Sequence, residues 1–106
     1  MQESEFNNLA AAALAGIERA LEACGADIDY ELQAGGVLEL EFAGGSKIVI
    51  NRHAAAREIW VAARAGGFHF RFEGGRWVGT RDGVELLAAL SRLISDQAGE
   101  AVELSA

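Results

Sequence analysis

The sequence predicts an α+β fold: a two-layer sandwich with two helices packed on one face of an antiparallel sheet of about six strands. Apolar residues recur at helical spacing near both ends of the chain. The segment between them alternates apolar and polar residues with a period of two, and its turns are short and glycine-rich. Each element has one apolar face, so both helices should cover the same face of the sheet and leave the other face open.

The first predicted helix covers residues 4–25. Ser4 is a candidate N-cap, because its hydroxyl can accept a hydrogen bond from the first turn, and Gly25 is a candidate stop. The predicted apolar stripe consists of Phe6, Leu9, Ala13, Ile17, Leu21 and Cys24. Cys24 ends this stripe, which predicts a small buried residue.

The alternating segments include DIDYELQ, VLELEF, KIVIN and FHFRFE, with REIWVAAR before the last of them. Such alternation is typical of strands with one buried and one solvent-facing side. Trp60 alternates with apolar residues, so we expect it on the open face, whereas Trp77 should lie partly in the core. The predicted open face carries Asp27, Asp29, Glu31, Glu39, Glu41, Lys47, Val49, Asn51, Trp60, Ala62, Arg64, His69, Arg71 and Glu73.

A second helix is predicted after the sheet. Asp82 and Glu85 have the D-x-x-E spacing of a capping pair. The apolar stripe that follows consists of Leu86, Leu87, Leu90, Leu93 and Ile94. We expect the tail AGEAVELSA to lie extended against the helices.

Length and charge narrow the function classes. The 106 residues suit one domain, residues 1–106, with a single core. A net charge of −7 disfavours nucleic acid and anionic lipid and favours cations or a basic protein surface. We recognise no signal peptide and no apolar run long enough to cross a membrane. The single cysteine fits a cytoplasmic protein.

The strongest candidate site is a set of five carboxylates. Glu18 and Glu22 are four residues apart and share a helix face. If that face neighbours the first strand, Glu18, Glu22, Asp27, Asp29 and Glu31 form one acidic ridge. Rows of hard oxygen ligands would bind Ca²⁺, Mg²⁺, Mn²⁺ or iron weakly. The alternative is a solvated acidic edge that prevents aggregation. Catalytic motifs are not recognisable, and His53 and His69 fit ordinary surface histidines.

Long ordered blocks of this chain resemble the frataxin family, in its bacterial CyaY branch. They are SEF at the start, GGVLELEF, GSKIVINR, EIWVAARAGGFHF, WVGTRDG and QAGEAV, and together they span nearly the whole chain. The resemblance implies the same α+β sandwich. Some features depart from the family pattern: Arg19, Ala23 and Gly25 stand where an acid is common, and Ala55 stands where relatives have proline.

The resemblance implies a regulator of iron–sulfur cluster assembly that binds ferrous and ferric iron weakly through the ridge. It implies docking on the cysteine desulfurase and the scaffold protein, through a surface that includes Asn51, Arg52 and Trp60. It also implies a monomer that iron can drive into oligomers. One alternative is an acidic interaction module with incidental metal binding. A third reading, oxidation of ferrous iron, is suggested for some relatives, but no di-iron motif supports it here and we expect no enzyme activity.

Overall fold

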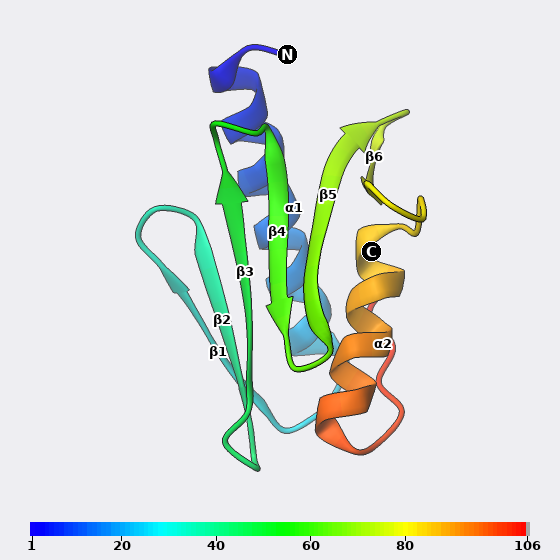
Figure 1. The fold of residues 1–106 in the computed structure, drawn as a ribbon. Coiled ribbons are helices and arrows are strands. Elements are labelled where there is room, and N and C mark those ends of the chain that lie inside the picture. Colours follow the sequence, from blue (N-terminus) through cyan, green and yellow to red (C-terminus); the bar gives the residue numbers. More distant parts are fainter. Residues whose placement is uncertain (106) are drawn as a thin grey trace.

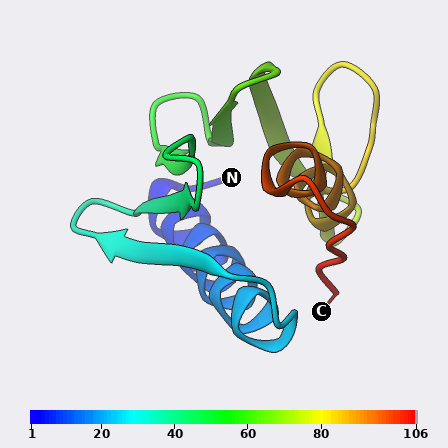
Figure 2. The same cartoon turned by 90° about the horizontal axis from the view of Figure 1, so that it is seen from below.

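The computed structural model describes residues 1–105 of the chain and confirms the two-layer sandwich. The elements are α1 (Glu3–Ala23), β1 (Ile28–Gln33), β2 (Val37–Phe42), β3 (Lys47–His53), β4 (Glu58–Ala63), β5 (Gly66–Glu73), β6 (Arg76–Gly79) and α2 (Leu86–Ala98). The strands form one six-stranded antiparallel sheet in sequential order. Both helices cover the same face of this sheet (Figure 1, Figure 2), which leaves the other face open.

The core lies between the sheet and the helices. Leu38, Ile50 and Val61 face each other across β2, β3 and β4, and none is more than 1% exposed. On the helix side, Phe6 of α1 packs edge-on against Trp77 of β6, with ring centroids 6.0 Å apart. Trp77 is 7% exposed, as the sequence predicts. The period-two pattern therefore sets which face of β2, β3, β4 and β5 is buried. It does not hold at the two edges of the sheet, because Leu32, expected on the inward side of β1, is 49% exposed and β6 buries consecutive residues.

The N-terminus of α1 differs from the prediction. The helix begins at Glu3, and its N-cap is Gln2, which makes no side-chain capping hydrogen bond. The predicted N-cap Ser4 is wrong, because that residue lies inside the first turn. Glu3 and Glu5 place two carboxylates in this turn, where the unpaired backbone N–H groups favour negative charge. The predicted stop is confirmed: the helix ends at Ala23, and Gly25 has a φ of +74°.

The buried face of α1 is rotated slightly from the predicted stripe. Its buried residues are Phe6, Ala10, Leu14, Ile17, Ala20 and Leu21. Leu9 and Ala13 lie at the flank of this face and are partly buried. Cys24 is also partly rather than fully buried, and its thiol donates a hydrogen bond to Leu21 O at 3.1 Å.

The capping pair predicted for the second helix is wrong. Glu85 itself is the N-cap of α2, and its carboxylate accepts hydrogen bonds from Leu87 N at 3.1 Å and Ala88 N at 3.3 Å. Asp82 instead accepts from Val84 N at 3.0 Å in the preceding turn. Glu85 forms a β-bridge with Val78, which holds it in an extended conformation. The helix can therefore begin only after residue 85.

The tail packs on α2 as expected. Val102 and Leu104 are 8% and 4% exposed and belong to the core. Two serines of α2 bind the tail backbone: Ser91 Oγ accepts from Leu104 N at 2.8 Å, and Ser95 Oγ accepts from Val102 N at 2.9 Å. These bonds satisfy the tail's N–H groups without a strand partner.

Gln97 fastens the end of α2 to two turns of the sheet. Its amide nitrogen donates to Ser46 Oγ at 3.0 Å and to Lys47 O at 3.2 Å, and its oxygen accepts from Arg64 N at 2.9 Å. Arg64 was expected on the open face, but β4 ends at Ala63 and Arg64 lies in the following turn. Its guanidinium pairs with Asp96 of α2 at 3.2 Å. One amide thus joins the β2–β3 and β4–β5 turns to the helix layer.

Gln97→Ala should lower the free energy of unfolding by about 1–2 kcal/mol, because it removes several hydrogen bonds between the two layers at once. Urea unfolding followed by circular dichroism measures this loss. Asp96→Ala is the matched control, because it removes an ion pair whose side chains are both 56% exposed. Such a pair contributes less than about 1 kcal/mol. Equal losses in the two variants would contradict the role of Gln97.

Candidate functional site

The acidic ridge is divided between the two sides of β1. Asp29 and Glu31 are exposed and point to the open face, where they lie opposite Glu41 and Glu39 of β2. Asp27 is exposed in the link between α1 and β1. Since β1 is an edge strand, this part of the ridge follows the rim of the sheet.

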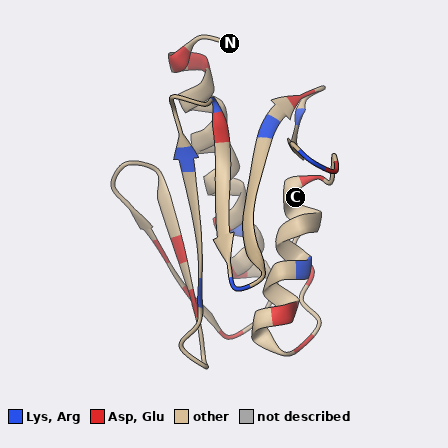
Figure 3. Ribbon diagram, viewed as in Figure 1, with Lys and Arg blue, Asp and Glu red and all other residues tan. Residues whose placement is uncertain are grey.

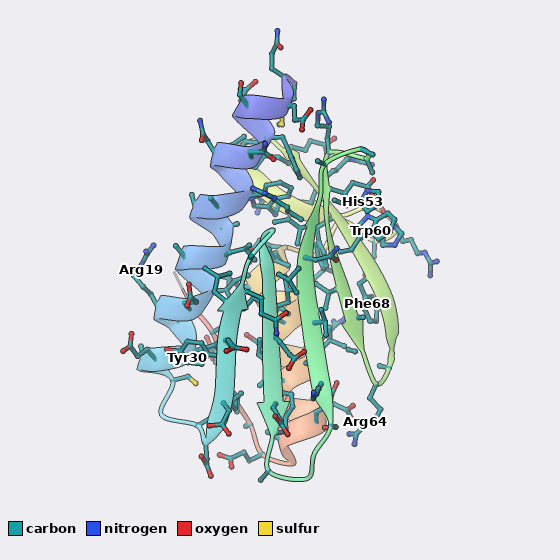
Figure 4. The ribbon with its side chains drawn as sticks, turned by 90° about the vertical axis from the view of Figure 1, so that its left-hand side faces the viewer. Arg19, Tyr30, His53, Trp60, Arg64 and Phe68 are labelled. Atoms are coloured by element: carbon teal, nitrogen blue, oxygen red, sulfur yellow. The ribbon has the colours of Figure 1, made fainter. Side chains whose placement is uncertain are left out.

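Glu18 and Glu22 approach β1 from the helix side. Tyr30 lies between Asp29 and Glu31 in sequence and points toward α1 (Figure 4). Partial burial raises the pKa of Tyr30 above its ordinary value of 10.0, and the carboxylates of Glu22 and Glu18 raise it further. This electrostatic coupling requires that the two carboxylates lie near the phenol. The ridge was expected only if the helix face that carries Glu18 and Glu22 neighbours the first strand, and this face does so.

The acidic ridge does not converge on one point. Among residues 1–105, no three His, Cys, Asp or Glu side chains are placed to hold one metal ion together. The carboxylates instead line both sides of an edge strand, and Figure 3 shows acidic positions on β1, on β2 and in the α1–β1 link. This arrangement can attract a cation or a basic surface, but side chains must move before several oxygens reach one ion.

The open face beside the ridge carries negative charge that is only partly neutralised. Asp29 is directly opposite Glu41, and Glu31 is directly opposite Glu39. Like charges at directly opposed positions destabilise a sheet. Lys47 of β3 offsets part of this repulsion, with its amine 3.4 Å from Glu39. The sequence places Glu39 and Glu41 on the open face, but only the register shows that they oppose acidic residues of the ridge.

Two of the three predicted docking residues lie together. Asn51 and Trp60 are cross-strand partners on β3 and β4, and His69 of β5 follows in the same row. Arg52 is in register with the buried Ile59, so its side chain leaves β3 on the helix side. It lies against Gly36, where an added methyl group would come within 2.8 Å of Arg52 Cδ.

Trp60 lies on the open face as predicted, but it is partly buried, because other side chains enclose it. Its indole nitrogen donates a hydrogen bond to Glu58 Oε1 at 2.8 Å. The rings of His53 and His69 stack on its two sides, at centroid distances of 3.7 and 4.3 Å. Sequence reasoning treated both histidines as ordinary surface residues. The period-two pattern places His69 on the same open face as Trp60, whereas His53 was expected in a loop and instead ends β3.

Comparisons with known proteins identify the family. Residues 1–100 match the family described as a frataxin-like domain. The chain belongs to this family. It is 64% identical over 104 residues to the iron-sulfur cluster assembly protein CyaY of Dechloromonas aromatica, with 98% of this chain and 99% of that protein covered. It is 57% identical over 102 residues to the protein of the same name from Cupriavidus taiwanensis, with coverage of 93% and 92%.

Solved structures of family members have the same fold. The frataxin of Psychromonas ingrahamii superposes with a TM-score of 0.91 at 38% identity, and each chain is completely covered. The trimeric frataxin of the yeast Saccharomyces cerevisiae, solved in complex with ferrous iron, gives a TM-score of 0.67 at 27% identity. That match covers 94% of this chain and 88% of the yeast protein. Within residues 1–105, no helix has the length and apolar character required to span a membrane.

Neutralising the helix half of the ridge should lower the pKa of Tyr30 toward 10.0. In the native chain both Glu18 and Glu22 disfavour the phenolate, so Glu18→Gln with Glu22→Gln should make the phenol ionise at lower pH. Tyr30 is the only tyrosine, so the ultraviolet absorbance of the phenolate reports it directly. Native stability should also fall as pH rises above 10.0, because the unfolded phenol ionises first.

Glu41→Gln is the matched control for this titration, because Glu41 is exposed on the open face of the neighbouring strand. It removes one carboxylate near the same strand without touching the helix side. A Tyr30 titration curve that shifts as much in the control as in the double variant would contradict the placement of Glu18 and Glu22.

Proposed function

We propose that the protein is an iron-binding regulator of iron–sulfur cluster assembly in the cytoplasm. It docks on the complex of cysteine desulfurase and scaffold protein and modulates cluster formation. The observation that carries this proposal is the acidic ridge around β1, whose carboxylates lie opposite further carboxylates of β2. Support also comes from relatives of up to 64% identity that are named for iron–sulfur cluster assembly.

Iron is the cation that the ridge takes in this proposal. Carboxylate oxygens are hard ligands suited to ferrous and ferric iron. Because the oxygens lie in rows on a rigid helix and strand, each ion gains few protein ligands, and binding is weak and multivalent. The yeast relative solved with ferrous iron supports the choice of metal, and its trimeric state supports the formation of oligomers. Without iron the protein is a monomer.

Docking uses the same negative charge together with the open face. The net charge is −7, and β1 and β2 carry four acidic and no basic residues, so they steer a basic surface toward this side of the molecule. The association should therefore weaken with salt. Asn51 and Trp60 supply the neighbouring contact on β3 and β4. Arg52 is the less central member of this surface, because it leaves the strand on the opposite side.

A second candidate function is an acidic interaction module whose metal binding is incidental. The absence of a converging metal site within residues 1–105 favours it. In neither function is the protein an enzyme. The ridge has no ordered pair of iron positions, so we assign it no ferroxidase activity.

Reversing charge on the helix half of the ridge should weaken both iron and desulfurase binding. Glu18→Lys with Glu22→Lys changes the local charge by four, and we expect about a tenfold loss of desulfurase affinity at low salt. Isothermal titration calorimetry measures it. Glu73→Lys with Glu103→Lys is the control, with the same change in net charge at exposed positions away from β1. The ridge would have no role if both double variants behaved like the native chain.

Ferrous iron should perturb α1 and β1 first. In an NMR titration without oxygen, we expect amide shifts confined to α1, β1 and their link, which overlap those caused by the desulfurase. This overlap is expected because both ligands are attracted by the same carboxylates. A desulfurase footprint with no specific iron response would instead identify the interaction module.

A further inference from the structure

The open face carries a stack of three rings contributed by three strands. The rings of His53 and Trp60 are 3.7 Å apart with an interplanar angle of 13°, and those of Trp60 and His69 are 4.3 Å apart with an angle of 8°. His53 ends β3, Trp60 lies in β4 and His69 in β5. Figure 4 shows His53 and Trp60 side by side, on the side of the sheet away from α1.

The stacking direction fixes how the indole stands. Nearly parallel rings with closely spaced centroids have their normals along the line that joins them, and here that line runs from strand to strand. The rings therefore stand upright on the sheet, and both faces of the indole are covered. The indole N–H already donates to Glu58 Oε1 at 2.8 Å. A partner therefore reaches the ring edges, not an aromatic face or a free indole donor.

The rim of the stack offers a hydrogen-bond donor at His53. His53 Nδ1 accepts a hydrogen bond from Ala56 N at 3.3 Å, so the proton of the neutral ring is on Nε2. His69 turns Nδ1 toward Glu58 Oε1, 3.6 Å away, so Nδ1 carries the proton of its neutral ring and Nε2 is an acceptor; its side chain is 46% exposed. Aromatic edges carry partial positive charge. At its His53 end the rim thus favours an acceptor such as a backbone carbonyl, whereas the acidic ridge favours cations.

We propose that His53 and His69 are positioning residues that brace Trp60 edge-on for docking. The partner patch that meets them presents a hydrogen-bond acceptor to His53 Nε2, and a basic patch of the same assembly lies over the acidic ridge. This inference rests on the proposed function, because it assumes that Trp60 contacts the desulfurase–scaffold assembly. The stack is not a metal site, because the indole separates the two imidazoles.

The support that His53 and His69 give to the Trp60 indole is tested first in the free protein. His53→Ala with His69→Ala should free the indole, which lowers the heteronuclear NOE of the Trp60 indole N–H. The buried Trp77 serves as the internal reference. His53→Phe with His69→Phe should restore the NOE, because it keeps both rings. The single alanine variants provide the same test if a double variant fails to fold. An unchanged NOE in the folded alanine variants would overturn the brace.

The docking role is tested with purified desulfurase and scaffold protein. We expect the alanine double variant to bind about tenfold more weakly, as does Trp60→Ala, and the phenylalanine variant to be intermediate, since it braces the indole but lacks the Nε2 donor. Native affinity in the alanine variant, with binding weakened by Trp60→Ala, would overturn the docking role alone. Native affinity in Trp60→Ala would show that Trp60 does not contact the desulfurase–scaffold assembly. The NOE would still show whether the two histidines hold the indole in place.

Discussion

The burial of one face of the six-stranded sheet against α1 and α2 is the interaction on which the rest of the structure depends. The large inward apolar residues of β2, β3 and β4 are almost fully buried: Leu38, Leu40, Phe42, Ile48, Ile50, Ile59 and Val61. Each such side chain contributes about 1.5–3 kcal/mol when it leaves water. A slip of one residue in any strand would move its whole apolar set to solvent. This penalty fixes the register, and the register places every side chain of the open face.

The open face can carry destabilising features because the buried face holds the fold. Asp29 and Glu31 lie directly opposite Glu41 and Glu39, an arrangement that costs stability in a sheet. Lys47 offsets only part of the cost at Glu39. A cation or a basic partner would relieve the remainder, so the same repulsion that weakens the free protein favours its binding. Functional sites commonly trade stability in this way.

Rigid elements hold both candidate surfaces. The ridge joins α1 to an edge strand, and Gln97 and the serines of α2 fasten the helix layer to the sheet turns and to the tail. The ring stack draws on three adjacent strands, so its rings keep the spacing that the sheet imposes. A basic surface over the ridge and a surface with an acceptor for His53 could therefore dock side by side on these rigid elements.

The sequence by itself determined the fold class, the inward and outward faces of β2, β3, β4 and β5, and the acidic and aromatic residues of the open face. Apolar spacing is a local property that reports burial directly. The tertiary structure alone decided what depends on neighbours distant along the chain. Helix packing brought Glu18 and Glu22 to Tyr30, the turn after β4 carried Arg64 to Asp96, and the bridge of Val78 to Glu85 set the start of α2. The stacking of His53 on Trp60 belongs here too. Periodicity predicts the face on which a side chain lies, whereas register, strand twist and rotamer decide which neighbour it touches.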